Sequence, residues 1–419
     1  MQLTRRNFLK SSVAVLPAFA TLPAVFRRAV ASSIVESPTN TSPYPDRTLI
    51  IVQMAGGNDG LNTVIPFADG KYYDHRSYLA VQENEVLDLN GEVGLHPVLE
   101  KMKLLWDEGD LAIVQGVGYP NQSYSHFESM HIWQTSDNAG KLKEGWLGRY
   151  FDSLKETQDN IFQGLATGQG QLPPEYSAEN YSAPVLRTVS EYQLKGDPIY
   201  VGSNQSRAEA VMKLYAASPL QTPYGILLDN TIEAAYKSSQ QIKEAADQYV
   251  SAIEYPDTSF AKSLKVIAQA ITAGLGVKVG HVRIGGFDTH SDQLVEQPDL
   301  LKTMSEAIYA FLQDIKAANK EDDVLVMTWS EFGRRVGSNG SGGTDHGAAA
   351  PMFLMGKPVA GGIYGEKPDL VRLDKDNLRF TTDFRSVYST VLSQWLGADP
   401  EAIIGSERFD TIPLLLKSK

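Results

Sequence analysis

Five short apolar runs, each followed by a polar or glycine-rich turn, constrain the fold of this chain more than any other feature. They cover residues 48–54, 111–115, 277–284, 323–329 and 351–355. Short continuous apolar runs bounded by turn residues are typical of strands buried on both faces of a sheet. Segments with helical spacing separate them, at residues 97–108, 125–133, 230–253, 259–273, 299–318 and 382–396. Strands alternating with helices predict an α/β fold with a doubly wound, mostly parallel sheet flanked by helices.

The composition changes between residues 137 and 225. This stretch is polar, rich in Gln, Gly, Ser and Tyr, and poor in long apolar runs. We interpret it as an insertion or cap on a domain of residues 47–400, with residues 401–419 as a C-terminal tail. A cap of this kind would select the substrate, and its sequence carries no motif that names one.

The first 31 residues have the organisation of an export signal. Arg5 and Arg6 precede an apolar run at residues 13–26, and small residues follow at 29–31. That order predicts a cleaved signal peptide, and the paired arginines indicate the twin-arginine pathway. The apolar run is shorter than the roughly 20 residues of a spanning helix, so we expect no stable membrane anchor. Residues 32–46 are expected to be a flexible lead-in. The mature protein should be periplasmic or extracellular, with the twin-arginine translocase as a partner.

Charge and cysteine content exclude several classes of function. Residues 1–31 hold five of the 38 Lys and Arg and none of the 50 Asp and Glu, so the remainder has a formal charge of −17. Nucleic acid is therefore not an expected partner, because a phosphate backbone requires a basic surface. The chain has no cysteine, which excludes disulfides, thiolate nucleophiles and cysteine-ligated zinc.

Polar side chains gather where the predicted strands end, the place where open α/β sheets bind ligands. The first four strands are followed by Asp59, Asn62 and Thr63, by Ser123, Ser125 and His126, by Asp288 and His290, and by Glu331 and Arg334; Asp345 and His346 precede the fifth. Imidazole and carboxylate together suit zinc, manganese or iron. In an extended segment, Asp288 and His290 point the same way. A divalent metal site at this edge is therefore predicted. The alternatives are a hydrogen-bonded turn at Asp288 and a helix cap or arginine pair at Glu331.

The chain resembles a known family in five motifs, at residues 56–63, 125–127, 286–291, 330–334 and 344–347. Their order is similar to that of the unknown-function family 1501, whose members are typically bacterial proteins exported by the twin-arginine pathway. The resemblance spans about residues 47–400. This family is grouped with the alkaline-phosphatase-like superfamily, which includes sulfatases and phosphomutases. The resemblance implies a doubly wound sheet that carries one or two divalent metals (zinc, manganese or calcium) and a Ser or Thr nucleophile.

The resemblance also implies roles for single residues. Ser125 resembles the nucleophile, with Ser123 and Thr63 as rivals. Apart from the resemblance, Arg334 is a candidate oxyanion clamp, because a guanidinium group matches tetrahedral oxyanions. Phe332 departs from the phosphatase pattern, in which a histidine follows the last carboxylate. The candidate metal ligands are Asp59, Asn62, His126, Asp288, His290, Glu331, Asp345 and His346.

Two functions are compatible with this pattern. The first is an exported, metal-dependent hydrolase of phosphate or sulfate esters, acting on a small-molecule or polymer substrate through a metal-activated Ser or Thr. The alternative is a non-catalytic exported binding protein that retains the alkaline-phosphatase-like fold; Phe332 and the polar insertion motivate this hypothesis.

Overall fold

The computed structural model describes residues 44, 46–154, 160–189 and 223–416. The expected signal peptide, nearly all of the lead-in, and residues 155–159 and 190–222 of the expected cap lie outside these ranges. Among the helices of the described ranges, none combines the length and apolar character needed to cross a membrane.

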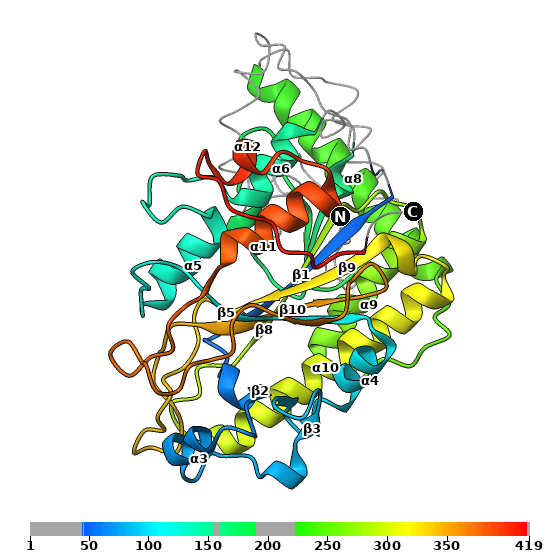
Figure 1. Cartoon of the computed structure of the whole chain (residues 1–419). Helices are drawn as coiled ribbons and strands as arrows, with labels where there is room; N and C mark the ends of the chain where they lie inside the picture. Colours follow the sequence, from blue (N-terminus) through cyan, green and yellow to red (C-terminus); the bar gives the residue numbers. More distant parts are fainter. Residues whose placement is uncertain (1–43, 45, 155–159, 190–222, 417–419) are drawn as a thin grey trace, which may run out of the picture.

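A mixed sheet of nine strands forms the centre of the described chain (Figure 1). The strand order is β11-β5-β10-β9-β1-β8-β6-β7, and β12 pairs with β5. The strands are β1 Thr48–Ala55, β5 Leu111–Gly118, β6 Gly164–Thr167, β7 Val185–Leu186, β8 Val279–Gly285, β9 Val324–Trp329, β10 Ala350–Met355, β11 Gly362–Tyr364 and β12 Thr382–Asp383. Each pairing is parallel except the two that β10 makes, with β5 and β9. The prediction of a mostly parallel sheet flanked by helices is confirmed.

Both faces of the sheet are covered, which explains the unbroken apolar runs. Alternate residues of a strand point to opposite faces. Along β1, Ile50 and Val52 belong to one core cluster, whereas Leu49 and Ile51 belong to the other. A strand with two buried faces needs apolar side chains at every position.

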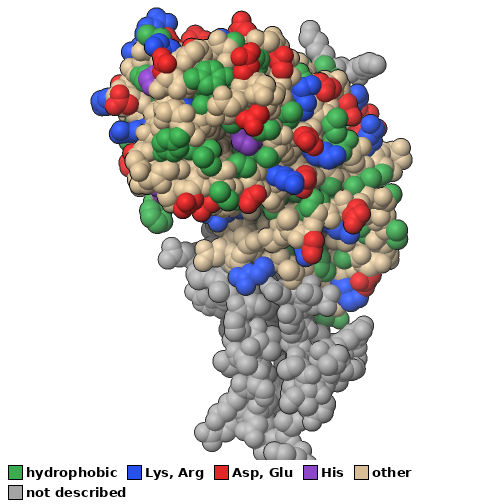
Figure 2. Space-filling view, turned by 90° about the horizontal axis from the view of Figure 1, so that it is seen from below, with side chains coloured by type: hydrophobic (Ala, Val, Ile, Leu, Met, Phe, Trp, Pro, Cys, Tyr) green, Lys and Arg blue, Asp and Glu red, His purple; other side chains and the backbone are tan. Residues whose placement is uncertain are grey.

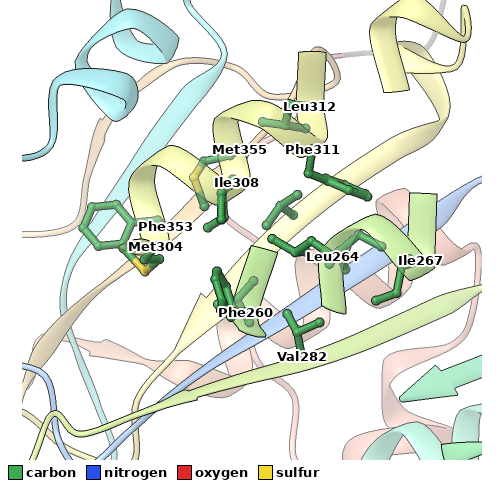
Figure 3. Close-up of a cluster of buried hydrophobic side chains, with 14 of the residues drawn as sticks. Phe260, Leu264, Ile267, Val282, Met304, Ile308, Phe311, Leu312, Phe353 and Met355 are labelled. Carbon is green, nitrogen blue, oxygen red and sulfur yellow. The ribbon is translucent and has the colours of Figure 1, made fainter. Parts of the chain in front are cut away.

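Helices form a layer on each face (Figure 1). The first face carries α4 Glu100–Glu108, α9 Ser259–Thr272 and α10 Gln293–Ala317, with α8 Pro223–Gln248 beside α9. The second carries α5 His126–Thr135, α6 Trp146–Ser153, α11 Phe384–Thr390, its π-helical continuation Val391–Leu396, and α12 Pro400–Ile404. Figure 3 shows the first layer at close range, where Phe260 and Leu264 of α9 meet Phe311 of α10 above Val282 of β8.

A small three-stranded sheet lies beside the main one. It contains β2 Val64–Ile65, β4 Gly94–Leu95 and β3 Leu87–Asp88 in that order, and α3 Gly70–Arg76 packs nearby in a third apolar cluster. Short 3₁₀ turns occur at Gly60–Asn62, Glu83–Glu85, Ile161–Gln163, Pro174–Tyr176 and Glu321–Asp323. The surface seen from below mixes acidic and basic side chains, with apolar side chains between them (Figure 2).

Within the described ranges, the segments predicted as a cap and as a tail both pack on the main domain. Much of the expected cap belongs to the main domain, because β6 pairs with β8 in the central sheet and Trp146 of α6 is buried in the second core cluster. The expected tail also packs on the domain: α12 and Leu414 join the same cluster. The strands β6 and β7 are too short, and their surroundings too polar, to be recognised as sheet from sequence.

Candidate metal centre

The direction of β10 brings five loops to one edge of the sheet. Strands β1, β5, β8 and β9 are parallel, so their carboxyl ends share an edge. Because β10 is antiparallel, its amino end lies at that edge too. The segment before β10 therefore joins the segments after the other four strands.

Asp288 occupies the centre of a group of three histidines at this edge. Its Oδ1 lies 2.9 Å from His346 Nε2 and 3.1 Å from His290 Nε2, and its Oδ2 lies 3.4 Å from His126 Nε2. One ligand atom from each of His126, Asp288 and His346 fits within a mutual distance of 4.8 Å. We call Asp288 and the three histidines the cluster.

Each imidazole of the cluster is held from behind by an acceptor. The pairs are His126 Nδ1 with Glu331 Oε1 at 2.8 Å, His290 Nδ1 with Asp345 Oδ1 at 3.2 Å, and His346 Nδ1 with the Tyr124 carbonyl oxygen at 2.8 Å. A carboxylate or carbonyl oxygen only accepts hydrogen bonds, so each Nδ1 must donate. In the neutral ring, Nε2 is then unprotonated and carries a lone pair. Acceptors of this kind fix the tautomer and orientation of metal-ligating histidines.

The Nε2 atoms of His290 and His346 lie 2.9 Å apart. Two lone pairs at this distance repel each other, and the carboxylate of Asp288 adds negative charge beside them. The arrangement is stable only if a positive charge, a proton or a metal ion, is shared among these atoms. Three imidazole nitrogens and one carboxylate oxygen are also a common ligand set for zinc, so the residues present fit a divalent metal.

Arg334 organises the loops around the cluster and is not free to clamp a substrate oxyanion, which corrects its predicted role. Its side chain is 1% exposed. The guanidinium donates to Asp288 Oδ1 at 2.5 Å, which opposes the charge of that carboxylate. Its other acceptors are the backbone oxygens of Gly56, Gly57, Phe287 and Thr344. One buried cation thus holds the loops after β1 and β8 against the loop before β10.

Glycines let these loops approach one another. Gly56 has a φ of +125°, and a Cβ on it would lie 2.4 Å from the backbone nitrogen of Asp288. A Cβ on Gly57 would lie 2.4 Å from the ring of Phe332. That ring packs on the cluster, with its centroid 4.5 Å from His346 and 4.9 Å from His126. Phe332 therefore supports the imidazoles as an apolar platform.

The electrostatics of the cluster favour an ionised Asp288 and a protonated imidazole. Partial burial alone would raise the pKa of Asp288, but the hydrogen bond and positive charge of Arg334 are the main causes that lower it to about 2. The hydrogen bond with Glu331 raises the pKa of His126, against the opposing effect of burial. A site that stabilises one positive charge in this way is also suited to a cation.

Glu331 and Asp345 stand behind the imidazoles, although both were predicted as ligands. Glu331 is fully buried, and its Oε1 accepts from the backbone nitrogen of Gly56 at 2.9 Å as well as from His126. Its Oε2 has no hydrogen-bond partner among the described residues. Asp345 accepts from Asn339 Nδ2 at 3.1 Å, a bond that lowers the pKa of Asp345.

Asp59, predicted as a ligand, lies outside the cluster in a buried ion pair. Arg76 Nη2 donates to Asp59 Oδ1 at 2.9 Å, and Nη1 contacts Oδ2; both side chains are fully buried. Gln293 and the backbone nitrogen of Leu61 donate to the same carboxylate. Its acceptor positions are therefore taken up by protein donors.

Asn62 and Thr63 are likewise committed to structural hydrogen bonds. Asn62 donates to the Leu79 carbonyl at 2.7 Å and accepts from Tyr72 at 2.9 Å. Thr63 is fully buried, and its hydroxyl donates to the Asp59 carbonyl at 2.7 Å. Neither side chain faces the cluster as a free ligand or nucleophile, which is a correction to both predictions.

The two serine candidates differ in their partners. Ser123 Oγ donates to Glu128 Oε2 at 2.8 Å. Ser125 is exposed at the amino end of α5, directly before His126, and its side chain makes no hydrogen bond within the described ranges. A third serine, Ser129, fixes α5 by donating to the Glu331 carbonyl.

Some residues that build the cluster carried no usable sequence signal. Tyr124 acts through its backbone carbonyl, which any residue type supplies. Asn339 lies in the glycine-rich run 338–343, where its side chain accepts from the backbone nitrogens of Ser341 and Gly343. Asparagine among glycines indicates a turn, and this pattern alone predicted that residues 338–343 form a loop.

The fold and cluster define an α/β protein with a candidate metal centre at the carboxyl edge of its sheet. The chain belongs to the family described as "Protein of unknown function (DUF1501)", whose model matches residues 112–410. No curated protein matches the chain.

Solved structures give weak matches over most of the chain. The C-terminal periplasmic domain of EcEptC from Escherichia coli is 10% identical with a TM-score of 0.41, over 88% of this chain and 90% of that one. A protein in the alkaline phosphatase superfamily from Vibrio parahaemolyticus is 11% identical with a TM-score of 0.40, over 91% and 76%. The PsFucS1 sulfatase from Pseudoalteromonas sp. is 13% identical with a TM-score of 0.38, over 87% and 70%.

Proposed function

We propose that this protein is an exported, metal-dependent hydrolase of phosphate or sulfate esters, with His126, His290, His346 and Asp288 as the metal ligands. The observation that carries the proposal is the 2.9 Å approach of His290 Nε2 to His346 Nε2 beside Asp288. The acceptors behind the rings keep the proton on Nδ1, so each Nε2 carries a lone pair in the neutral ring. A divalent cation relieves the repulsion between these lone pairs.

The donor set favours some metals over others. Three imidazole nitrogens with one carboxylate suit zinc best, and manganese next. Calcium prefers six to eight oxygen ligands, so it ranks last of the three metals considered. When bound, such a metal supplies positive charge that polarises an ester oxygen and favours the ionised form of a nearby hydroxyl.

Ser125 is the proposed nucleophile. Its hydroxyl is exposed beside a ligand and has no hydrogen bond to lose within the described ranges. The amino end of α5 adds positive potential, which favours an anionic phosphate or sulfate group there. The hydroxyl oxygen attacks phosphorus or sulfur, the alcohol leaves, and water then hydrolyses the new serine ester. The commitments of Ser123 and Thr63 to other partners make them weaker candidates.

The export route completes the proposal. Residues 1–31 have the twin-arginine pattern, and this pathway carries proteins that have already folded. A chain exported in that state can acquire its metal before it leaves the cytoplasm. The proposed location is the periplasm or the exterior, with the twin-arginine translocase as the transient partner.

Metal analysis of the purified mature protein is the first test. We expect at least one bound zinc or manganese ion, lost in Asp288→Ala and in His346→Ala. Metal-free wild-type protein after loading with each metal would refute the proposal.

A panel of aryl phosphates and sulfates is the second test. Ser125→Ala should abolish turnover while metal content stays the same, and Ser123→Ala is the matched control that should retain turnover. Bound metal without turnover on any ester would favour the non-catalytic binding protein.

A further inference from the structure

A cavity of about 620 Å³ is lined partly by residues that continue the loops of the candidate metal centre, including Gly60 and Ala349. Its apolar walls include Leu61, Val64 and Val93, and the segment from Glu366 to Arg372 covers one side. This volume is within the range of small-molecule sites in proteins. No residue of the cluster lines it, so the cavity is separate from the centre.

A β-bulge shapes the floor of the cavity. Ala350 of β10 pairs with Val117 and Met352 pairs with Val114, so β5 holds one extra residue over this interval. Gly116 lies in the bulge with a φ of +62°. Bulges of this kind re-aim side chains and are frequent next to functional sites.

Gln115 lines this cavity. The two-residue alternation of β5 puts Gln115 on the same face as Leu111 and Ile113, among apolar residues. Its side chain is 4% exposed and makes no hydrogen bond with the described residues. An amide that lines a cavity and has no protein partner is available to hydrogen-bond a ligand or water there.

Two of the three basic side chains at the rim form ion pairs. Lys367 pairs with Glu92 at 3.1 Å, and Asp369 pairs with Arg372. Arg379 makes no ion pair with the described residues, but it faces a rim that also holds acidic groups. Three basic and three acidic side chains line the cavity, so its charge is balanced.

We propose that this cavity binds an uncharged group that carries hydroxyls or an amide, such as an amido sugar. Gln115 offers both a donor and an acceptor, which matches vicinal hydroxyls or an amide. The balanced rim does not select a polyanion, and the apolar walls take the non-polar face of a ring. If the proposed function holds, this group is the alcohol part of the ester substrate. The identification with the substrate rests on the proposed function, whereas the binding of the group to the cavity is independent of it.

Two loops connect the lining of the cavity with the centre. Gly60 follows the Gly56 loop, and Ala349 is three residues from His346. Three residues span at most about 11 Å. One lining residue, Ala349, therefore lies within about 11 Å of the backbone of His346.

Binding of N-acetylglucosamine, which has neither phosphate nor sulfate, tests the proposal. The dissociation constant is measured by saturation-transfer NMR for wild type, Gln115→Leu and Val371→Trp. Gln115→Leu keeps the side-chain size and should weaken binding about tenfold. Val371 is a 72% exposed cavity-lining residue, so the tryptophan should obstruct the cavity without disturbing the core. Gln240→Leu, away from the cavity, is the matched control and should bind like wild type.

The same measurement on His346→Ala separates the two proposals. N-acetylglucosamine should bind this variant as it binds wild type, whether or not the metal centre exists. No saturable binding by wild type, or equal constants for wild type, Gln115→Leu and Val371→Trp, would overturn the assignment of the cavity. Inorganic phosphate that binds His346→Ala and is released in Arg379→Ala would also overturn it, because the cavity would then select anions.

Discussion

Replacement of Asp59 by Asn tests whether this carboxylate is structural or a metal ligand. Asp59 and Arg76 form an ion pair with both side chains fully buried. Apart from Asp59, the guanidinium contacts only the Arg335 carbonyl, at 3.0 Å, and its Nε has no partner in the described ranges. Asp59→Asn keeps the shape but leaves a buried cation without its counter-charge. Loss of one partner of a buried pair costs about 3–5 kcal/mol, and we expect a loss of this size.

Two controls separate the charge from the shape. Asp59→Leu combined with Arg76→Met removes both charges, so the double variant should cost less than the sum of the single changes. Lys103 and Asp107 form an exposed pair at 2.6 Å, and Asp107→Asn should cost less than about 1 kcal/mol.

Urea unfolding followed by circular dichroism measures the free energy of unfolding of each variant, and metal analysis is done in parallel. Asp59→Asn should be destabilised while it retains its metal at saturating concentration. If it loses the metal at unchanged stability, Asp59 is a ligand and the structural interpretation is refuted.

Three further predictions concern titration, loop packing and ring orientation. Burial lowers the pKa of His96 from 6.5 to about 4, so the folded state favours the neutral ring and stability falls as pH drops below the unfolded value. Between roughly pH 7.5 and pH 5 the free energy of unfolding of the wild type should fall by about 2 kcal/mol more than that of His96→Asn. Urea unfolding at each pH measures it, and the same pH dependence in both proteins would contradict this prediction. Gly56→Ala places a Cβ 2.4 Å from the Asp288 nitrogen, so it should reduce the metal content of the protein. It should also be about 1–3 kcal/mol more destabilising than the control Gly405→Ala. Gly405 also has a positive φ (+103°), but a Cβ there meets open space. Similar unfolding and metal content in both alanine variants would argue against the close loop approach. Glu331→Gln should weaken metal affinity about 10- to 100-fold in chelator competition, and an unchanged affinity would show that Glu331 does not orient its imidazole.

The sequence located the important edge of the sheet because strand ends have a local signature. An apolar run followed by glycine and polar residues is readable at β1, β8 and β9 without knowledge of their neighbours. The order of those strands is irrelevant to this step, because parallel strands bring their carboxyl ends to one edge in any order.

The role of each acid at that edge was not readable. Asp59 and Asp288 both follow buried strands, and their local sequences do not distinguish them. Arg76 of α3 pairs with Asp59. Asp288 instead has His290 from its own loop and two histidines, His126 and His346, from other segments. Arg76, His126 and His346 are distant in sequence from the acids they contact, so only the tertiary structure assigns these partners. For the same reason the structural role of Arg334 was not predicted, because its backbone acceptors come from three separate loops.

The reversed strand β10 is what allows His346 to take part in the cluster. Had β10 run parallel to β9, the segment before it would lie at the opposite edge of the sheet, a strand length away. With β10 antiparallel, the chain leaves β9, forms the loop with Glu331 and Arg334, and returns at the same edge. There His346 pairs with Arg334 in an isolated antiparallel bridge. The bridge brings the histidine beside the arginine that also holds Asp288, so strand direction and loop packing together produce the donor set.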